Sequence, residues 1–379
     1  MYVQYTNPAG YPPLQHSSRI LAEKGFQVLF LGSGAQGAAT LDFPFHPRIR
    51  VKQLRFCEAG WRQKLHYATF ALWTLLWVLF WRPRWIYASD PLSCPVAALL
   101  SFVPGLRVLY HEHDSPNAIP NSKFESLVMT LRRKVARKAD ICVLPNENRA
   151  DRFKSQTGTE RPVVCVWNCP AVEEAGERTA LRDGDSFVIF FHGSIVPARL
   201  PLAVIEALKS LPDQVVLNVA GYETIGHAGY IQALQDHARR LGIEERFRYL
   251  GAFSRYPLFA HCRNASVGLS LMPLNSIDVN EQAMTGASNK PFDYLACGLP
   301  LLVSDLPEWR NMFVDPGYGL ACDPEDPSSI ANAVCWFLNN NVETRTMGLL
   351  GRQRIMDDWN YQRQFEPVLA HLCSATLEI

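Results

Sequence analysis

Short apolar runs typical of buried strands alternate with helix-like segments along both halves of this chain. In the first half we expect strands at 2–5, 27–31, 85–88, 107–110, 141–144 and 163–167, and helices at 13–24, 62–81, 95–102 and 122–138. The second half begins again, with strands at 187–191, 215–219, 247–250, 267–271 and 301–304. Strands that alternate with helices form parallel sheets covered by helices. The sequence therefore predicts α/β architecture with two Rossmann-like domains.

The length of 379 residues fits two domains of ordinary size. We place the first at residues 1–175 and the second at 183–360, because the segment 171–185 is polar, rich in Glu and typical of a linker. Ligands of such sheets bind at the carboxyl ends of the strands. We therefore expect the two domains to face each other across a ligand-binding cleft.

The formal net charge of +1 conceals an uneven distribution of charge. Residues 1–170 contain 21 Lys and Arg against 11 Asp and Glu, whereas the remainder contains 16 against 25. A basic half fits an anionic surface or acceptor. It fits equally well a pair of domains that balance each other's charge.

The ten cysteines are scattered, and most lie in apolar runs. They form no Cys-x-x-Cys pair and have no His or Cys at the spacing of a zinc site. The start of the chain is polar and resembles no signal peptide. We therefore expect a cytoplasmic protein whose cysteines are small core residues.

Residues 67–81 form a run of apolar and aromatic residues without a charge, flanked by Arg62, Lys64, Arg82 and Arg84. The run is shorter than the roughly 18 residues that a membrane-spanning helix needs. A second basic cluster follows on an expected helix: Arg132, Arg133, Lys134, Arg137 and Lys138. Two interpretations stay open, namely a core helix of the domain and an interfacial helix on the inner, anionic face of a membrane.

The segment 289–305 predicts an anion site. Pro291 suits the first turn of a helix, and the preceding residues 285–289 form a small, polar loop. A helix N-terminus offers free N–H groups and the positive end of the dipole, to which Lys290 adds a charge. Asp293, one turn into the helix, is placed to accept ribose hydroxyls, or it only complements the helix dipole. We expect a nucleotide-diphosphate ligand here.

The run His111-Glu112-His113-Asp114 follows an apolar strand and so lies at a carboxyl end, where ligands bind. Alternate residues of a strand point to opposite sides, which separates the two histidines from the two acids. This arrangement argues against a metal site. A role in ligand binding and a role in bracing the loop both remain open for His113.

A Gly-x-Gly-x-x-Gly pattern at residues 32–37 is not a dinucleotide site. Such a site needs a helix that opens at the glycines and an acid about twenty residues later. The chain instead continues with two prolines and the basic residues Arg48, Arg50, Lys52 and Arg55. We expect no NAD binding.

The second half resembles the family 4 (group 1) glycosyltransferases over roughly fifty residues. The matching positions are Lys290, Asp293, Tyr294, Cys297, Gly298, Pro300, Gly319, Leu320, Pro324, Asp326 and Pro327. The resemblance implies the GT-B fold, with a last helix at about 363–379 that returns to the first domain. It also implies a hexosyltransferase that moves sugar from a nucleotide-diphosphate sugar to an acceptor hydroxyl. The anomeric configuration would be retained, and neither a metal ion nor a cofactor would be needed.

The resemblance further assigns roles to individual residues. His113, in the spacing Tyr110-x-x-His113, would contact the donor sugar, with Asp114 or Glu112 orienting it. Arg199 and Lys290 would face the diphosphate, and Asp293 would hold the ribose. The remaining donor contacts would come from Gly10, Gly193, Ser194, Gly221, Tyr222, Glu223, Ser288 and Asn289.

Two positions depart from the family pattern. Ser194 stands where Arg is usual, and Thr285 stands where the first of two paired acids is usual. The expected partners are a nucleotide-sugar donor and a saccharide or lipid-linked acceptor in cell-surface polysaccharide or glycolipid synthesis, with no nucleic acid. A GT-B nucleotide-sugar epimerase and a catalytically weak nucleotide-sugar-binding subunit remain as alternative functions.

Overall fold

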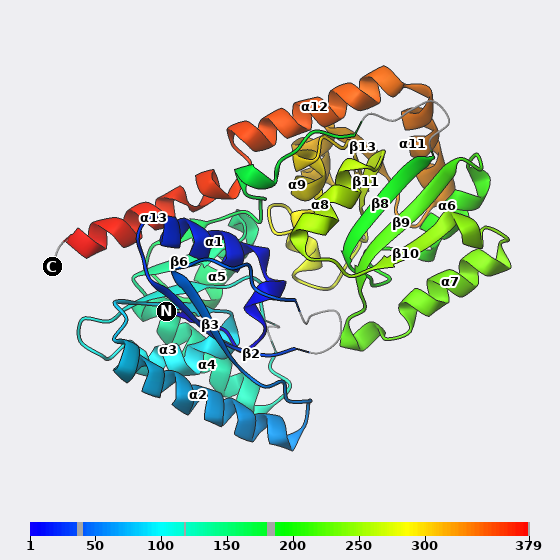
Figure 1. The fold of residues 1–379 in the computed structure, drawn as a ribbon. Coiled ribbons are helices and arrows are strands. Elements are labelled where there is room, and N and C mark those ends of the chain that lie inside the picture. Colours follow the sequence, from blue (N-terminus) through cyan, green and yellow to red (C-terminus); the bar gives the residue numbers. More distant parts are fainter. Residues whose placement is uncertain (36–40, 117–118, 180–185, 378–379) are drawn as a thin grey trace. The chain divides into compact units, whose positions relative to one another are not determined.

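The computed structural model describes residues 1–35, 41–116, 119–179 and 186–377, shown as a ribbon in Figure 1. The chain forms two compact units. The first comprises Met1–Asn168 together with Tyr361–Ile379, and the second comprises Cys169–Asn360. Each unit contains one parallel sheet with helices on both faces, so the expected α/β fold with two Rossmann-like domains is confirmed.

The first unit contains a seven-stranded sheet in the order β3-β2-β1-β4-β5-β6-β7, in which all neighbours are parallel. The strands are β1 (Tyr2–Val3), β2 (Val28–Ser33), β3 (Ile49–Leu54), β4 (Trp85–Ser89), β5 (Arg107–His111), β6 (Ile141–Leu144) and β7 (Val163–Cys165). The strand order reverses between β1 and β4. Ligands bind at the carboxyl ends of strands beside such a reversal.

Successive side chains of each strand point to opposite faces of this sheet, and each face packs against its own set of helices. In β5, Val108 and Tyr110 face the core formed with one set of helices, whereas Leu109 faces the other. The first set is α2 (Trp61–Trp81), α3 (Cys94–Leu100), α4 (Lys123–Lys138) and α5 (Glu147–Thr157). The opposite face is covered by α1 (Pro12–Glu23) and α13 (Tyr361–Leu377).

The second unit contains a six-stranded parallel sheet in the order β10-β9-β8-β11-β12-β13. Its strands are β8 (Phe187–Ser194), β9 (Val215–Tyr222), β10 (Phe247–Gly251), β11 (Val267–Ser270), β12 (Leu301–Ser304) and β13 (Gly319–Cys322). One face packs against α6 (Leu202–Ser210), α7 (Tyr230–Arg240) and α11 (Pro327–Asn339). The order reverses between β8 and β11.

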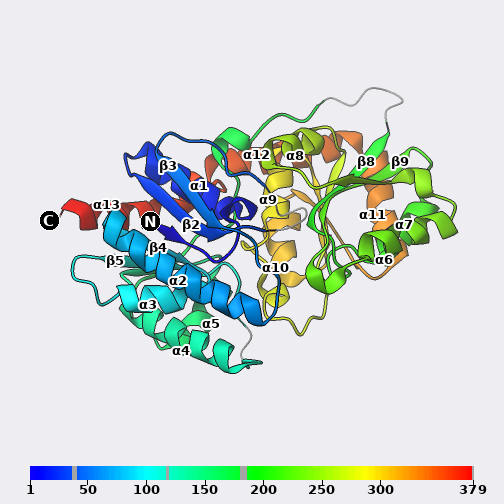
Figure 2. The same ribbon diagram turned by 60° about the horizontal axis from the view of Figure 1, so that its bottom comes forward.

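The remaining helices of this unit are α8 (Arg255–Arg263), α9 (Asn289–Ala296), α10 (Pro307–Trp309) and α12 (Asn341–Asp357). Helix α9 lies directly on β11, because a Cβ atom on Gly268 would come within 2.2 Å of the Tyr294 ring. Helix α12 packs closely on the turn after α9, where a Cβ atom on Gly348 would lie 2.0 Å from the carbonyl oxygen of Gly298. The strands of both units appear between their helices in the rotated view of Figure 2.

Most elements agree with the sequence-based expectation, and two strands had not been expected. These are β3 and β13, each at the edge of its sheet. The strands β8 and β9 also continue further than expected, through Ser194 and Tyr222. The Gly-x-Gly-x-x-Gly pattern begins inside β2, and its last glycine, Gly37, lies outside the described residues.

Candidate functional site

The N-terminus of α9 presents several polar groups that lack partners. Ser288 occupies the N-cap position, yet its side chain makes no capping hydrogen bond. Its hydroxyl is buried and has no hydrogen-bond partner among the described residues. The first N–H groups of a helix have no acceptor within the helix, and here the third position is a proline. This helix end is therefore equipped to bind an acceptor-rich group.

Lys290, on the first turn of α9, is 6% exposed. Its ammonium group makes no hydrogen bond or ion pair with any residue that the structure describes, and it lies 5.5 Å from the centre of the Phe191 ring. Burial holds the pKa of Lys290 well below its usual value, the positive charge of Arg199 lowers it further, and the negative charge of Asp293 offsets part of this shift. A buried, unpaired ammonium is costly in the free protein and attracts an anion.

Two glycines at the carboxyl ends of β8 and β9 bring the main chain close to this lysine. Gly193 has a φ of +105°, and a Cβ atom there would lie 3.2 Å from Cε of Lys290. Gly221, paired with Gly193 across the sheet, has a φ of +149°, and its Cβ atom would lie 1.8 Å from the Gly193 carbonyl oxygen. A side chain at Gly193 would crowd Lys290, and one at Gly221 would collide with the main chain of Gly193.

Ser194 holds the side chain of Arg199 through a hydrogen bond. A guanidinium nitrogen of Arg199, Nη1, donates a hydrogen bond to Oγ of Ser194. The Nε atom of Arg199 is buried and has no partner among the described residues. Ser194 occupies the position where the family commonly has arginine, so the chain supplies its second positive charge from five residues further along.

Asp293 lies deeper and is 1% exposed. Nη2 of Arg255, from α8, is 2.9 Å from Oδ1 of Asp293 and 2.9 Å from Oε2 of Glu174. Nε2 of His192 is 3.6 Å from Oδ2 of Asp293. Burial, Lys290 and Arg255 all lower the pKa of His192, so this imidazole is neutral. The Asp293 carboxylate is thus held in place by Arg255.

The other residues expected to bind a donor lie close to this group or frame it. Asn289 is partly buried on the first turn of α9, and Tyr222 is exposed at the end of β9. The Glu223 carboxylate accepts the main-chain N–H groups of Gly229 at 3.1 Å and Ile231 at 2.6 Å. Glu223 therefore holds the start of α7 beside the loop that follows β9.

His113 is the main candidate residue of the first unit. It is buried just beyond the end of β5, with its ring 5.5 Å from that of Tyr11. Neither ring nitrogen has a hydrogen-bond partner among the described residues. Burial lowers the pKa of His113 to about 4, so the imidazole is neutral at neutral pH. Gly10, at the end of a short 3₁₀ turn (Pro8–Gly10) after β1, has open space around its Cα atom.

Asp90, which directly follows β4, was not anticipated from the sequence. Its Oδ1 atom accepts the main-chain N–H of His113 at 2.8 Å. Its φ of +62° is unusual for a residue other than glycine and marks a strained backbone. Burial and the nearby charge of Asp114 raise the pKa of Asp90 to about 8. The signal available in the sequence was a carboxylate placed immediately after a buried strand.

The two acids next to His113 both form ion pairs with buried arginines. Glu112 is buried and accepts hydrogen bonds from Nη2 of Arg132 at 2.7 Å and from the Tyr110 hydroxyl at 2.7 Å. Asp114 forms an ion pair at 3.3 Å with Arg149, whose Nη1 also donates to the His113 carbonyl at 2.6 Å. Asp114 therefore supports the main chain at His113 through Arg149, whereas Glu112 compensates the buried charge of Arg132. Arg132 consequently does not belong to the exposed basic cluster on α4.

Comparison with known proteins decides the family. Residues 186–340 match a model of "Glycosyl transferases group 1", and residues 14–169 match a model of a "Glycosyl transferase 4-like domain". Together the two models cover most of the chain. The chain belongs to the group 1 glycosyltransferases.

Individual relatives of this glycosyltransferase are distant. A GDP-mannose-dependent alpha-(1-6)-phosphatidylinositol monomannoside mannosyltransferase from Mycolicibacterium smegmatis is 22% identical over 258 residues, which span 62% of each protein. Anabaena HepE, solved with UDP and glucose, superposes with a TM-score of 0.69 at 17% identity, covering 99% of this chain and 100% of HepE. Sucrose-phosphate synthase from Thermosynechococcus elongatus gives a TM-score of 0.73 at 14% identity, with coverage of 99% and 100%. These structures establish the GT-B fold.

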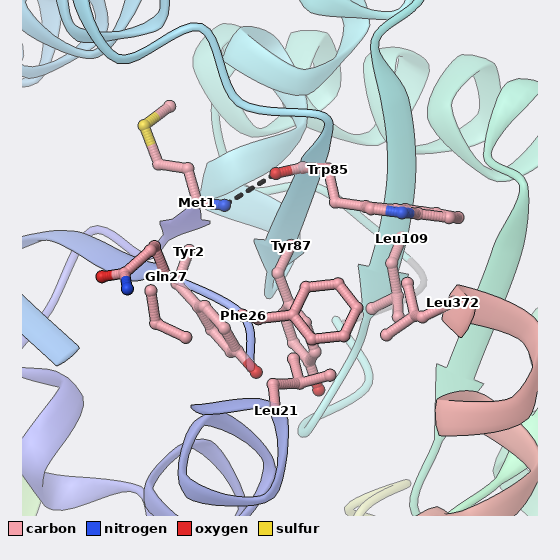
Figure 3. Close-up of a pocket in the computed structure, with 10 residues that line it drawn as sticks. Met1, Tyr2, Leu21, Phe26, Gln27, Trp85, Tyr87, Leu109 and Leu372 are labelled. Carbon is pink, nitrogen blue, oxygen red and sulfur yellow. Dashed lines mark hydrogen bonds between the residues drawn. The ribbon is translucent and has the colours of Figure 1, made fainter. Parts of the chain in front are cut away.

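The first unit of the glycosyltransferase also contains a small apolar pocket, which Figure 3 shows in close-up. It lies near the amino ends of β1 and β4, where the Met1 nitrogen donates to the Trp85 carbonyl at 2.7 Å. Its other lining residues are Tyr2, Leu21, Phe26, Gln27, Val28, Tyr87, Leu109 and Leu372. Because ligands of such sheets bind at the opposite, carboxyl ends, we assign this pocket to packing beneath α13.

The buried Glu112–Arg132 pair gives a prediction about stability. Replacing Arg132 by methionine is expected to lower the free energy of unfolding by about 3–5 kcal/mol, because it leaves the Glu112 carboxylate buried and uncompensated. The double variant Glu112→Leu, Arg132→Met removes both charges and is expected to recover much of that loss. Urea denaturation followed by far-UV circular dichroism measures both. Strictly additive losses would contradict the coupling of these two side chains.

Proposed function

We propose that this glycosyltransferase moves a hexose from a nucleotide-diphosphate sugar to an acceptor hydroxyl. The single observation that carries the donor class is the buried Lys290 ammonium group, which is 6% exposed and forms no salt bridge or hydrogen bond with a described residue. It lies on the first turn of a helix whose cap hydroxyl also lacks a partner. Such a group of unsatisfied donors fits a diphosphate.

In the proposed reaction, Lys290, Arg199 and the N-terminus of α9 stabilise the negative charge that develops on the departing diphosphate. The glycines at 193 and 221 allow the phosphates to approach the main chain, and Asp293 accepts the ribose hydroxyls. The other proposed donor contacts come from Ser194, Tyr222, Glu223, Ser288 and Asn289. The bound diphosphate would also relieve the cost of burying Lys290.

In the first unit, we assign the transferring sugar to His113 and Gly10. A neutral imidazole donates one hydrogen bond and accepts one, which suits a sugar hydroxyl. Asp90 accepts the main-chain N–H of His113 at 2.8 Å, and Arg149 donates to the His113 carbonyl oxygen at 2.6 Å. This fixed position lets His113 recognise the sugar without taking a charge.

The bond changes of the proposed reaction balance without a metal ion or cofactor. The bond between the anomeric carbon and the diphosphate oxygen breaks, and a bond from that carbon to the acceptor oxygen forms on the same face. The acceptor proton passes to the leaving diphosphate. The configuration at the anomeric carbon is thereby retained.

We further propose a saccharide or lipid-linked acceptor and a role in cell-surface polysaccharide or glycolipid synthesis at the cytoplasmic face of a membrane. Support comes from the mannosyltransferase relative, whose name specifies a phosphatidylinositol mannoside acceptor. It also comes from the excess of positive charge in residues 1–170.

The test is incubation of the full chain with a panel of uridine, guanosine and adenosine diphosphate sugars. We expect one donor to release its nucleotide, and the release to accelerate when a suitable acceptor extract is added. Analysis of the sugar product without any acceptor separates transfer from epimerisation, which would convert the donor without releasing nucleotide. Binding of no nucleoside diphosphate by calorimetry would refute the proposal.

A further inference from the structure

Helix α2 is apolar on both of its faces. One stripe, formed by Tyr67, Phe70, Thr74 and Val78, is buried against the sheet. The opposite stripe is exposed, with Leu79 at 73% and Phe80 at 78% exposure, and continues through Trp61, Leu65, Leu72 and Leu76. Charged residues are absent from positions 65–81. A surface helix normally has a polar outer face. The outer face of α2 is therefore suited to contact with an apolar partner.

The neighbouring helices extend this exposed stripe into a patch. Helices α2, α3 and α4 cover the same face of the sheet and lie side by side in Figures 1 and 2. Phe124, at the start of α4, contacts Tyr67 of α2 with ring centres 5.2 Å apart. Exposed apolar side chains also follow at the end of α3 and on α4, namely Leu99, Phe102, Val103 and Leu127. We refer to these exposed residues of α2, α3 and α4 as the apolar face.

Positive side chains border the apolar face. The Lys138 ammonium lies 3.3 Å from the centre of the Phe102 ring, and Lys134 is exposed one turn earlier on α4. On the other side, Lys52 and Arg50 of β3 lie over the rings of Trp77 and Trp81, at 5.2 Å and 5.6 Å. Arg82 and Arg84 follow the end of α2, and both are exposed. Tryptophan and basic residues around an apolar stripe are typical of a helix that lies at a lipid headgroup boundary.

We propose that the apolar face docks on an anionic lipid bilayer. Helix α2 lies in the plane of the interface, with Leu72, Leu76, Leu79 and Phe80 among the upper acyl chains, and the surrounding lysines and arginines contact lipid phosphates. The described helices include none that is long and apolar enough to cross a bilayer. The inference goes beyond sugar transfer, since it identifies the surface on which the enzyme would meet a lipid-linked acceptor.

Charge complementarity favours lipid over a second copy of the chain as the occupant. Two copies packed through this face would bring their lysine and arginine borders together, and like charges at an interface are repulsive. An anionic bilayer instead offers acyl chains for the leucines and phosphates for the basic border. Self-association becomes an outcome that the experiment must detect.

The test is co-sedimentation of the full chain with vesicles of phosphatidylcholine containing about 30% phosphatidylglycerol. We expect binding that falls when the salt concentration rises from about 0.05 M to about 0.5 M, and much weaker binding to phosphatidylcholine alone. The double variant Leu72→Ser, Leu76→Ser is expected to reduce partitioning at least about tenfold. Because both leucines are exposed, this variant should fold normally, which circular dichroism checks.

Two further variants make the result specific. Lys134→Gln, Lys138→Gln is expected to lower binding to anionic vesicles about tenfold and leave the weak binding to neutral vesicles unchanged. The matched control Leu349→Ser, Leu350→Ser alters two exposed leucines of α12 and should bind as the unmodified chain does. Nucleotide binding by all three variants is expected to be unchanged, which separates this inference from the proposed sugar transfer.

Three results would overturn the inference. The first is an absence of vesicle binding by the unmodified chain at low salt. The second is an equal loss of binding in the α12 control. The third is a dimer, seen by analytical ultracentrifugation, that Leu72→Ser, Leu76→Ser dissociates while vesicles remain unbound.

Discussion

Replacing Lys290 by methionine is expected to lower kcat/KM for the nucleotide sugar about 1,000-fold, because one preorganised charge at a departing oxyanion contributes on this scale. Methionine has a similar length and fills the same buried space beside Phe191 and Gly193. The variant therefore removes the charge and preserves the packing. Nucleotide release under initial-rate conditions measures the effect on catalysis, and calorimetry with the nucleoside diphosphate measures the effect on binding.

The same substitution is expected to stabilise the protein, by about 1 kcal/mol or more, because it removes a buried charge that forms no salt bridge with a described residue. A gain in stability together with a loss of activity is characteristic of a binding residue and is opposite to what a structural lysine would show. Lys209, exposed at the end of α6, is the matched control, and Lys209→Met should change neither quantity. Unaltered nucleotide release by Lys290→Met would refute the diphosphate assignment.

The uptake of a proton on ligand binding provides a further test of the role of Lys290. Its pKa is depressed by burial in the free protein, and a bound diphosphate raises it again by adding negative charge. Binding therefore takes up a proton wherever the free amine is partly neutral, so affinity should decrease as pH rises above the depressed pKa of the free amine. Calorimetry in two buffers of different ionisation enthalpy should show this uptake, and Lys290→Met should abolish it.

The segment around α9 could be predicted from the sequence because the residues that begin and end its helix lie within the segment itself. Pro291 sets the first turn of the helix and Gly298, with a φ of +71°, ends it, so the following strand begins at Leu301 as expected. The edge strand β3 was missed because it lacks a continuous apolar run: the exposed Arg50 and Lys52 alternate with the partly buried Ile49 and Val51. Edge strands carry such charges, and they weaken the pattern by which a buried strand is recognised.

The contacts within the candidate site could not be read in the same way, because they join distant parts of the chain. Arg255 connects Glu174 and Asp293 across separations of 81 and 38 residues, and each residue alone resembles an ordinary surface charge. Asp90 and His113 meet only because β4 and β5 are neighbours in the sheet. His113 and Lys290 could be proposed as site residues from the sequence, whereas the residues that contact them could be identified only from the fold.

Replacing His113 by alanine is expected to lower kcat about 100-fold while the affinity for the nucleoside diphosphate stays within about twofold, because the hydrogen bond it makes is to the sugar. The variant keeps the main-chain contacts to Asp90 and Arg149, which do not depend on the ring. His113→Asn retains a donor and an acceptor and should recover part of the loss. Equal activity of the alanine variant and the unmodified enzyme would contradict the assignment.

The acid side of the pH profile separates recognition by a neutral imidazole from acid–base catalysis. With a pKa of about 4, His113 stays neutral down to weakly acid pH, so activity should show no limb from this residue near pH 6.5. Stability should respond instead, because the unfolded chain binds a proton below about 6.5 and the folded protein resists it until about 4. The contribution of His113 to the free energy of unfolding is therefore lost as pH falls through that range. His113→Asn should remove this part of the acid sensitivity in denaturation curves, and an unchanged slope would show that folding does not shift the pKa of His113.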